Sequence, residues 1–145
     1  MRVLFLDVDG VLNRTGFRPE DSVGLRSWIE ADLAQRLCEV LHATGAGIVL
    51  ASDWRLNRAL DEVRDELRAA GIDAALIGAT PELRGQPRWR EIEAWMVQHT
   101  MAREAIVIVD DLHDMGPLAE RFVRTSPLTG LDAVAAQAIV ALYEG

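Results

Sequence analysis

Short apolar runs alternate with helical stripes along the chain, and this alternation most constrains the fold. The runs that predict buried strands cover residues 3–6, 48–51, 74–77 and 105–109, with a short edge strand at 122–123. Apolar residues recur at helical spacing over 32–43, 56–67, 92–99 and 131–143. Strands that alternate with helices predict an α/β fold, in which a central parallel sheet carries helices on both faces in three Rossmann-like layers.

The size and composition of the chain exclude several classes of protein. A length of 145 residues suits one domain over residues 1–145, and a 50% hydrophobic content excludes intrinsic disorder. Cys38 is the only cysteine, which excludes a disulfide scaffold and fits a reducing, cytoplasmic location. No apolar run approaches the ~20 residues of a membrane span, so no membrane association is expected.

Polar residues follow three of the expected strands, where each strand ends. These residues are Asp7, Ser52 and Asp110. Because the carboxyl ends of parallel strands share one edge of a sheet, the three side chains are predicted to meet there. Asp9 should point to the same side as Asp7, since the side-chain period of an extended chain is two.

A cluster of carboxylates at one edge needs a compensating charge. Asp111 and Asp114 add to the acidic residues, and all 15 basic residues are arginine, with no lysine in the chain. The oxygen ligands favour Mg²⁺, which is the usual cation beside a phosphate. A carboxylate can then attack phosphorus while a second carboxylate moves the proton. The net charge of −8 argues against a protein that coats nucleic acid by charge alone.

These residues also carry a family resemblance. Asp7-Val8-Asp9-Gly10-Val11-Leu12-Asn13 resembles the first signature of the haloacid dehalogenase (HAD) superfamily, and Ser52 and Asp110-Asp111 resemble the second and fourth signatures. Three further segments make nearly the whole chain similar to the HAD domain of Swiss Army Knife RNA repair proteins. They are Leu50 to Arg55, Arg88 to Trp95, and Thr125 to Leu131.

The resemblance implies a three-layer HAD fold and a Mg²⁺-dependent phosphatase that forms an aspartyl-phosphate. It implies that Asp7 is the nucleophile and that Asp9 is the general acid and base. It implies phosphate binding at Ser52 and the adjoining Asp53. It implies a metal site formed by Asp7, Asp9 (through its backbone carbonyl), Asp110, and either Asp111 or Asp114.

The basic residue of the third signature is usually lysine in this superfamily, so here an arginine must replace it. Arg88 is the first choice, because Arg88-x-x-Glu91-Ile92-x-x-x-Met96 resembles the pattern around the basic residue in this branch. Arg84 is the second choice, and Arg90 lies in the same stretch. A guanidinium fork can hold phosphate well.

The interval between Asp9 and Ser52 is too short to hold the large cap domain that many relatives insert. An open site follows, which admits a phosphate on a large molecule such as a nucleic-acid end, although a nucleotide or a sugar phosphate is also compatible. Six side chains are candidates to contact such a substrate: Arg14, Arg18, Arg55, Arg58, Trp28 and Trp54. The oligomeric state is not readable from the sequence.

Two other functions remain open for this pattern of residues. One is a module that binds phosphate ends without turning them over, through a degenerate HAD site. The other is a receiver-like phosphoacceptor domain, which also has a parallel sheet and an acidic Mg²⁺ pocket. Receivers normally need a lysine at the end of a late strand, and this chain has none.

Overall fold

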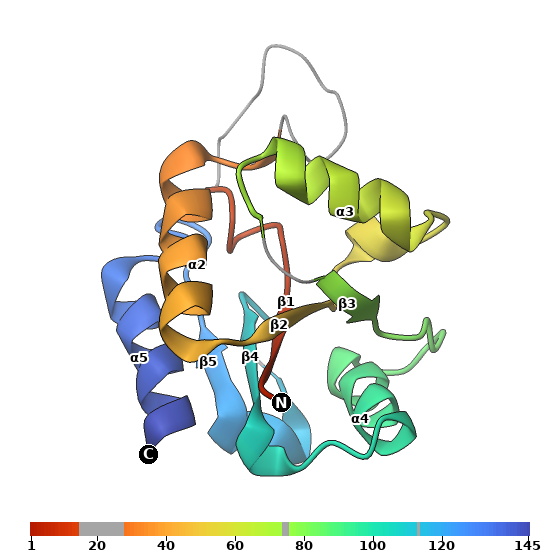
Figure 1. Cartoon of the computed structure of the whole chain (residues 1–145). Coiled ribbons are helices and arrows are strands. Elements are labelled where there is room, and N and C mark those ends of the chain that lie inside the picture. The colour runs from red at the N-terminus through yellow and green to blue at the C-terminus, as the bar shows by residue number, and fades with distance from the viewer. Residues whose placement is uncertain (15–27, 74–75, 113) are drawn as a thin grey trace.

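Five parallel strands form one sheet in the order β3-β2-β1-β4-β5 in the computed structural model (Figure 1), which describes residues 1–14, 28–73, 76–112 and 114–145. The strands are β1 (Val3–Leu6), β2 (Gly47–Leu50), β3 (Leu76–Ala79), β4 (Ile106–Asp110) and β5 (Phe122–Arg124). The first strand lies at the centre, between β2 and β4. All carboxyl ends therefore share one edge of the sheet.

Helices cover both faces of this sheet. They are α2 (Ala31–Thr44), α3 (Leu60–Ala69), α4 (Arg88–Gln98) and α5 (Ala133–Glu144). Helices α2 and α5 lie side by side over one face, where residues of α3 join the same core, while α4 and the 3₁₀ turn η3 (Gly116–Arg121) cover the other face (Figure 1). The predicted α/β class, with a parallel sheet between two helical layers, is confirmed.

The central strand explains the two layers. Leu4 and Leu6 belong to the core beneath α2 and α5, whereas Val3 and Phe5 belong to the core beneath α4. Successive side chains of a strand point to opposite faces, so a strand that is apolar at every position must be covered on both sides. On the α4 side, the ring of Trp95 meets Phe5 edge to face with centroids 5.5 Å apart.

Several expected boundaries were wrong, and the fourth strand runs over Ile106–Asp110 in place of 105–109. Strand β2 ends at Leu50, and the third strand runs over Leu76–Ala79, later than 74–77, whose residues 74 and 75 lie outside the described parts. Helix α3 begins at Leu60 and not at Leu56, because the short 3₁₀ turn η1 (Asp53–Arg55) comes first and Asn57 takes a left-handed conformation with φ of 57°.

No extra domain interrupts the alternation of strands and helices over the described ranges (Figure 1). The edge at which the strands end is therefore not covered by a cap there. None of the helices over these same ranges combines the length and the apolar character that crossing a bilayer requires.

Helix α5 offers a direct test of the packing. The side chain of Ile139 is fully buried in the core beneath α2 and α5. We expect Ile139→Ala to lower the free energy of unfolding by about 2–5 kcal/mol, because it removes buried methyl groups and leaves a cavity. Val134→Ala on the same helix is the matched control, since Val134 is 75% exposed. Urea unfolding measures both, and an equal effect of the two substitutions would contradict the assigned core face.

Candidate functional site

Three carboxylates meet at the carboxyl ends of the neighbouring strands β1 and β4. Asp7 follows β1 directly and Asp110 ends β4, and these strands pair in parallel with Leu6 opposite Val109. The backbone N–H of Asp7 extends this pairing by donating to the carbonyl of Val109 at 3.1 Å. One carboxylate oxygen each of Asp7, Asp110 and Asp111 lies within 4.8 Å of the others.

Two of the three carboxylates are buried, and their like charges repel one another. Asp7 and Asp110 are buried, and Asp111 is half-buried. Burial above all, and then the neighbouring charges of Asp110 and Asp111, raise the pKa of Asp7 to about 9. Burial also raises the pKa of Asp111, with the charge of Asp110 acting in the same direction. Such a group of oxygen donors fits a hard cation such as Mg²⁺, which favours the ionised carboxylates.

Arg88 brings a guanidinium to the cluster. It is the first residue of α4, and its side chain is only 14% exposed. Nη1 donates to Oδ2 of Asp110 at 2.7 Å and lies 3.4 Å from Oδ1 of Asp7. This contact lowers the pKa of Asp7, in opposition to burial. Nη2 lies 3.7 Å from Oδ1 of Asp53 at the rim.

The other two arginine candidates make different contacts. The side chain of Arg84 is 93% exposed, and its Nε lies 3.5 Å from Glu82. The guanidinium of Arg90 lies over the ring of Trp89 at 4.7 Å from the centroid. Among the three arginines considered in this stretch, Arg88 is the one that the fold brings to Asp7 and Asp110.

Ser52 and Asp53 lie at the turn after β2. Ser52 is buried, and its hydroxyl accepts a hydrogen bond from the backbone N–H of Trp54 at 3.2 Å, which caps η1. Asp53 projects outward with its side chain 83% exposed, near Arg88. The turn thus contributes a buried hydroxyl and an exposed carboxylate at the edge that holds Asp7.

Asp9 has different neighbours from Asp7. Its carboxylate is exposed and accepts hydrogen bonds from Nδ2 of Asn13 at 3.0 Å and from Nε1 of Trp54 at 3.3 Å. Strand β1 ends at Leu6, so the period of two no longer governs the direction of side chains at residue 9. Asp7 faces the buried cluster and Asp9 faces solvent between Asn13 and Trp54.

Gly10 allows Asp111 to approach the first turn of the site. Its φ is +81°, and a Cβ placed there would lie 2.7 Å from Cγ of Asp111. Only glycine meets both demands without strain. Asp114 is exposed and accepts from the N–H of Gly116 at 2.8 Å, outside the cluster of three carboxylates.

Arg55 has a role that the sequence did not reveal. It was a candidate to contact substrate, but its side chain is only 6% exposed. Its guanidinium donates to the carbonyls of Ser52 at 2.9 Å and Thr80 at 2.8 Å, and to Oε2 of Glu91 at 2.9 Å. It therefore ties the Ser52 turn to the loop after β3 and to the first turn of α4. Thr80 and Glu91 are distant from Arg55 along the chain, so no local pattern could indicate these contacts.

The other side chains that are candidates to contact substrate have partners of different kinds. Arg14 pairs with Glu30 and Asp32, and Arg58 pairs with Glu62 and Glu66. The ring centroids of Trp28 and Trp54 lie 6.4 Å apart. Arg18 lies outside the described residues.

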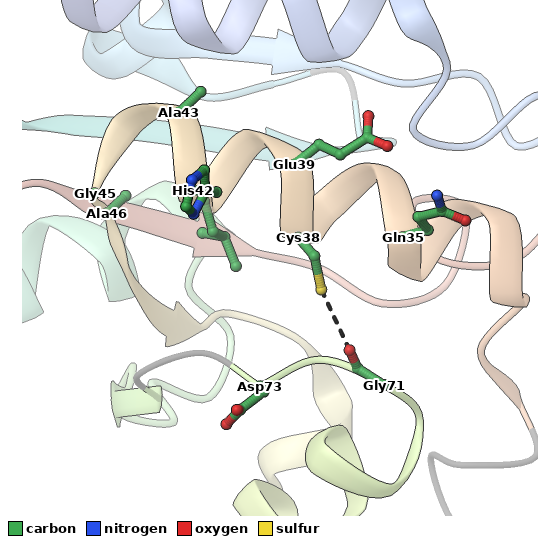
Figure 2. Close-up of a pocket in the computed structure, with 10 residues that line it drawn as sticks. Gln35, Cys38, Glu39, His42, Ala43, Gly45, Ala46, Gly71 and Asp73 are labelled. Carbon is green, nitrogen blue, oxygen red and sulfur yellow. Dashed lines mark hydrogen bonds between the residues drawn. The ribbon is translucent and has the colours of Figure 1, made fainter.

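Two hollows differ in their relation to the carboxylates. One of about 690 Å³ lies along α2, where Sγ of Cys38 contacts the carbonyl of Gly71 at 3.3 Å (Figure 2). Its lining includes Gly45 and Ala46, just before β2 begins, so it lies toward the opposite end of the strands. The other, of about 510 Å³, is lined by Asp9, Asp53, Trp54 and Arg58. We call it the Trp54 hollow.

A comparison with protein families gives an independent result. A family model described as the HAD domain in Swiss Army Knife RNA repair proteins matches residues 3–136. Searches of curated proteins and of solved structures found no significant match. The matched range contains Asp7, Asp9, Asp110, Asp111, the Ser52 turn and Arg88.

The raised pKa of Asp7 predicts a pH dependence of stability. Asp7 binds its proton more tightly in the folded protein than in the unfolded chain, where its pKa is 3.8. Its contribution is therefore fully present below about pH 4 and is lost as the pH rises toward about 9. Asparagine cannot ionise, so we expect Asp7→Asn to gain stability over the wild type as the pH is raised from about 5 to about 8.

Urea unfolding in the presence of a chelator measures this difference at the two pH values. Asp53→Asn is the control, because it removes an exposed carboxylate from the same edge. A stability difference between Asp7→Asn and the wild type that is the same at both pH values would contradict the assignment.

Removal of the Arg55 guanidinium should leave Glu91 as an uncompensated buried charge. We expect Arg55→Met to lower the free energy of unfolding by about 3–5 kcal/mol. Addition of Glu91→Gln to this variant should recover part of the loss. Arg84→Met is the control, since an exposed ion pair contributes about 1 kcal/mol or less. Thermal or urea unfolding measures the stability of each variant. Equal effects of the Arg55 and Arg84 substitutions would contradict a stabilising role for the buried pair of Arg55 and Glu91.

Proposed function

The chain belongs to the family of HAD domains in Swiss Army Knife RNA repair proteins, and from this premise we propose that it is a Mg²⁺-dependent phosphatase that forms an aspartyl-phosphate on Asp7. The observation that carries the proposal is the cluster of Asp7, Asp110 and Asp111, with the guanidinium of Arg88 against it. Three closely spaced carboxylates, two of them buried, beside a guanidinium are suited to bind a metal cation and a phosphoryl group together.

The donor set supports a hard divalent cation. Asp7, Asp110 and Asp111 would hold it, together with the backbone carbonyl of Asp9. Burial, and then the charges of Asp110 and Asp111, raise the pKa of Asp7 to about 9, and a divalent cation would favour its ionised form. Bound Mg²⁺ would shield the negative charges of the nucleophile and of the phosphoryl oxygens from each other.

The residues of the chain divide the chemical work. A carboxylate oxygen of Asp7 forms a bond to phosphorus, and the bond from phosphorus to the leaving oxygen breaks. Protonated Asp9 gives its proton to that oxygen. Asp9 then takes a proton from a water molecule that attacks phosphorus, which returns the carboxylate of Asp7 and releases inorganic phosphate. Ser52 and Arg88 hold the phosphoryl oxygens by hydrogen bonds, with Asp53 at the rim.

Several features support a substrate larger than a free sugar phosphate. The described residues place no cap over the carboxyl edge of the sheet, and the family description names RNA repair proteins. We propose a phosphorylated nucleic-acid end or a nucleotide as the substrate, and a cytoplasmic location in view of the single unpaired cysteine. The domain is proposed to extend over residues 1–145.

Turnover of a generic aryl phosphate tests the chemistry. We expect hydrolysis that requires Mg²⁺ and that falls by about 10⁴-fold or more in Asp7→Asn, since a nucleophile acts as part of one catalytic unit. Rapid acid quench should trap a phosphoryl group on the peptide that contains Asp7. Arg88→Ala should raise KM, and Arg84→Ala, which alters an exposed side chain, is its matched control.

Equal turnover by the wild type and Asp7→Asn would remove Asp7 as the nucleophile. Binding of Mg²⁺ and phosphate with no release of product over hours would instead support a module that binds phosphate ends. A panel of 5′- and 3′-phosphorylated oligonucleotides, mononucleotides and sugar phosphates, assayed side by side, identifies the preferred substrate.

A further inference from the structure

The Trp54 hollow shares its boundary with the catalytic edge. Two of the described residues that line it, Asp9 and Asp53, also belong to that edge. Asp53 lies 3.7 Å from the guanidinium of Arg88, which in turn lies 3.4 Å from Asp7. A phosphoryl group held between Asp7 and Arg88 would therefore have the hollow beside it.

The direction of Asp9 distinguishes this hollow from other surfaces near the cluster. The carboxylate of Asp9 is not part of the cluster of Asp7, Asp110 and Asp111 and is instead exposed where it lines the hollow. A general acid must lie within hydrogen-bond reach of the leaving oxygen that it protonates. The leaving group must then extend into the space that Asp9 faces.

Trp54 contributes two separable properties to that space. Its indole N–H donates to Asp9 with Nε1 3.3 Å from Oδ2 and 3.4 Å from Oδ1, which helps to fix the direction of the carboxylate. Among the described residues of the lining, its half-buried ring is the one apolar side chain, beside two carboxylates and Arg58. A flat ring in an open hollow offers a surface on which a planar group can stack.

The charged side chains among the described lining residues disfavour the binding of a second anion in the hollow. Arg58 is the cation among the described lining residues, but the guanidinium lies against Glu62 and Glu66 as well as over the Trp54 ring at 6.0 Å. Its charge is thus already balanced by carboxylates. The other charged residues of the described lining are Asp9 and Asp53, which lies 3.7 Å from the guanidinium of Arg88, and these carboxylates add no positive charge that would attract an anion. An uncharged planar group suits this surface better than a further phosphate.

We propose that the Trp54 hollow binds the leaving group of the substrate, that it favours a planar aromatic or heteroaromatic ring there, and that Trp54 positions Asp9 through its indole N–H. This inference rests on the proposed phosphatase activity for the role of Asp9. The preference for a planar ring can be measured without turnover.

Binding of two phosphonates tests the ring preference. Phenylphosphonate and cyclohexylphosphonate have carbon bonded to phosphorus, so they cannot be hydrolysed as phosphate esters, and they differ chiefly in the planarity of the ring. We expect the wild-type chain with Mg²⁺ to bind the phenyl compound about tenfold more tightly, as stacking on an aromatic side chain implies. Trp54→Phe should keep most of this preference, and Trp54→Leu should abolish it. Isothermal titration calorimetry gives the affinities.

Kinetics test the positioning role separately. Trp54→Phe keeps a ring but loses the indole N–H, so we expect kcat for phenyl phosphate to fall about tenfold with little change in KM, as for the loss of one hydrogen bond to a charged group. Trp54→Leu should lower kcat and raise KM. An unchanged kcat in Trp54→Phe would overturn the positioning role.

Equal affinity of the wild type for the two phosphonates would overturn the ring preference, and this comparison needs no variant to fold. Retention of the preference in a folded Trp54→Leu variant would also overturn it. If the wild-type chain does not hydrolyse phenyl phosphate, the proposed phosphatase activity is wrong. The phosphonate affinities would still show whether the hollow prefers a planar ring. The two failures are therefore distinguishable.

Discussion

The proximity of three carboxylates, two of them buried, at the carboxyl edge of the sheet is the constraint on which the site depends. Asp7 and Asp110 are buried side by side because β1 and β4 pair in register, and Asp111 approaches through the space that Gly10 leaves. A group of this kind is unfavourable in a folded protein unless a positive charge compensates it. Arg88 supplies part of that charge from the first turn of α4. The packing of α4 against Phe5 and Val49 therefore bears on the electrostatics of the edge as well as on stability.

The order of elements and the edge of the site could be predicted because both follow from local pattern. Each apolar run is bounded by a polar residue or a glycine, and parallel strands carry their carboxyl ends to the same side. Asp7, Ser52 and Asp110 could thus be brought to one edge from sequence alone, and the structure bears out this arrangement for the first and fourth strands in the proximity of Asp7 and Asp110. Arg88 was favoured over Arg84 only by its likeness to a family pattern. The physical difference is that Arg88 begins a helix packed on the sheet, whereas Arg84 projects from the loop before it.

What the sequence could not indicate depends on contacts between distant segments. An arginine is usually found at the surface, yet after folding the guanidinium of Arg55 donates to the carbonyl of Thr80 and to the carboxylate of Glu91. The start of α3 was misplaced for a related reason. Leu56 continues the spacing of the helical stripe, but the turn that Ser52 caps and the left-handed Asn57 separate it from the helix. Hydrophobic spacing carries no information about a turn that is fixed by a hydroxyl group and by a buried guanidinium.

Asp7 and Asp9 show how the end of a strand can give two nearby carboxylates different environments. The backbone pairing of β1 extends through the N–H of Asp7 to Val109, and this holds Asp7 against β4 and out of water. Past that residue the chain turns, and Asn13 and Trp54 hold the carboxylate of Asp9 at the surface. A nucleophile benefits from a dry, charge-compensated position, whereas an acid that must exchange its proton with water needs access to solvent. The break in backbone pairing between these two positions separates the environments, and the contacts of Asn13 and Trp54 with Asp9 complete the separation of the two proposed roles.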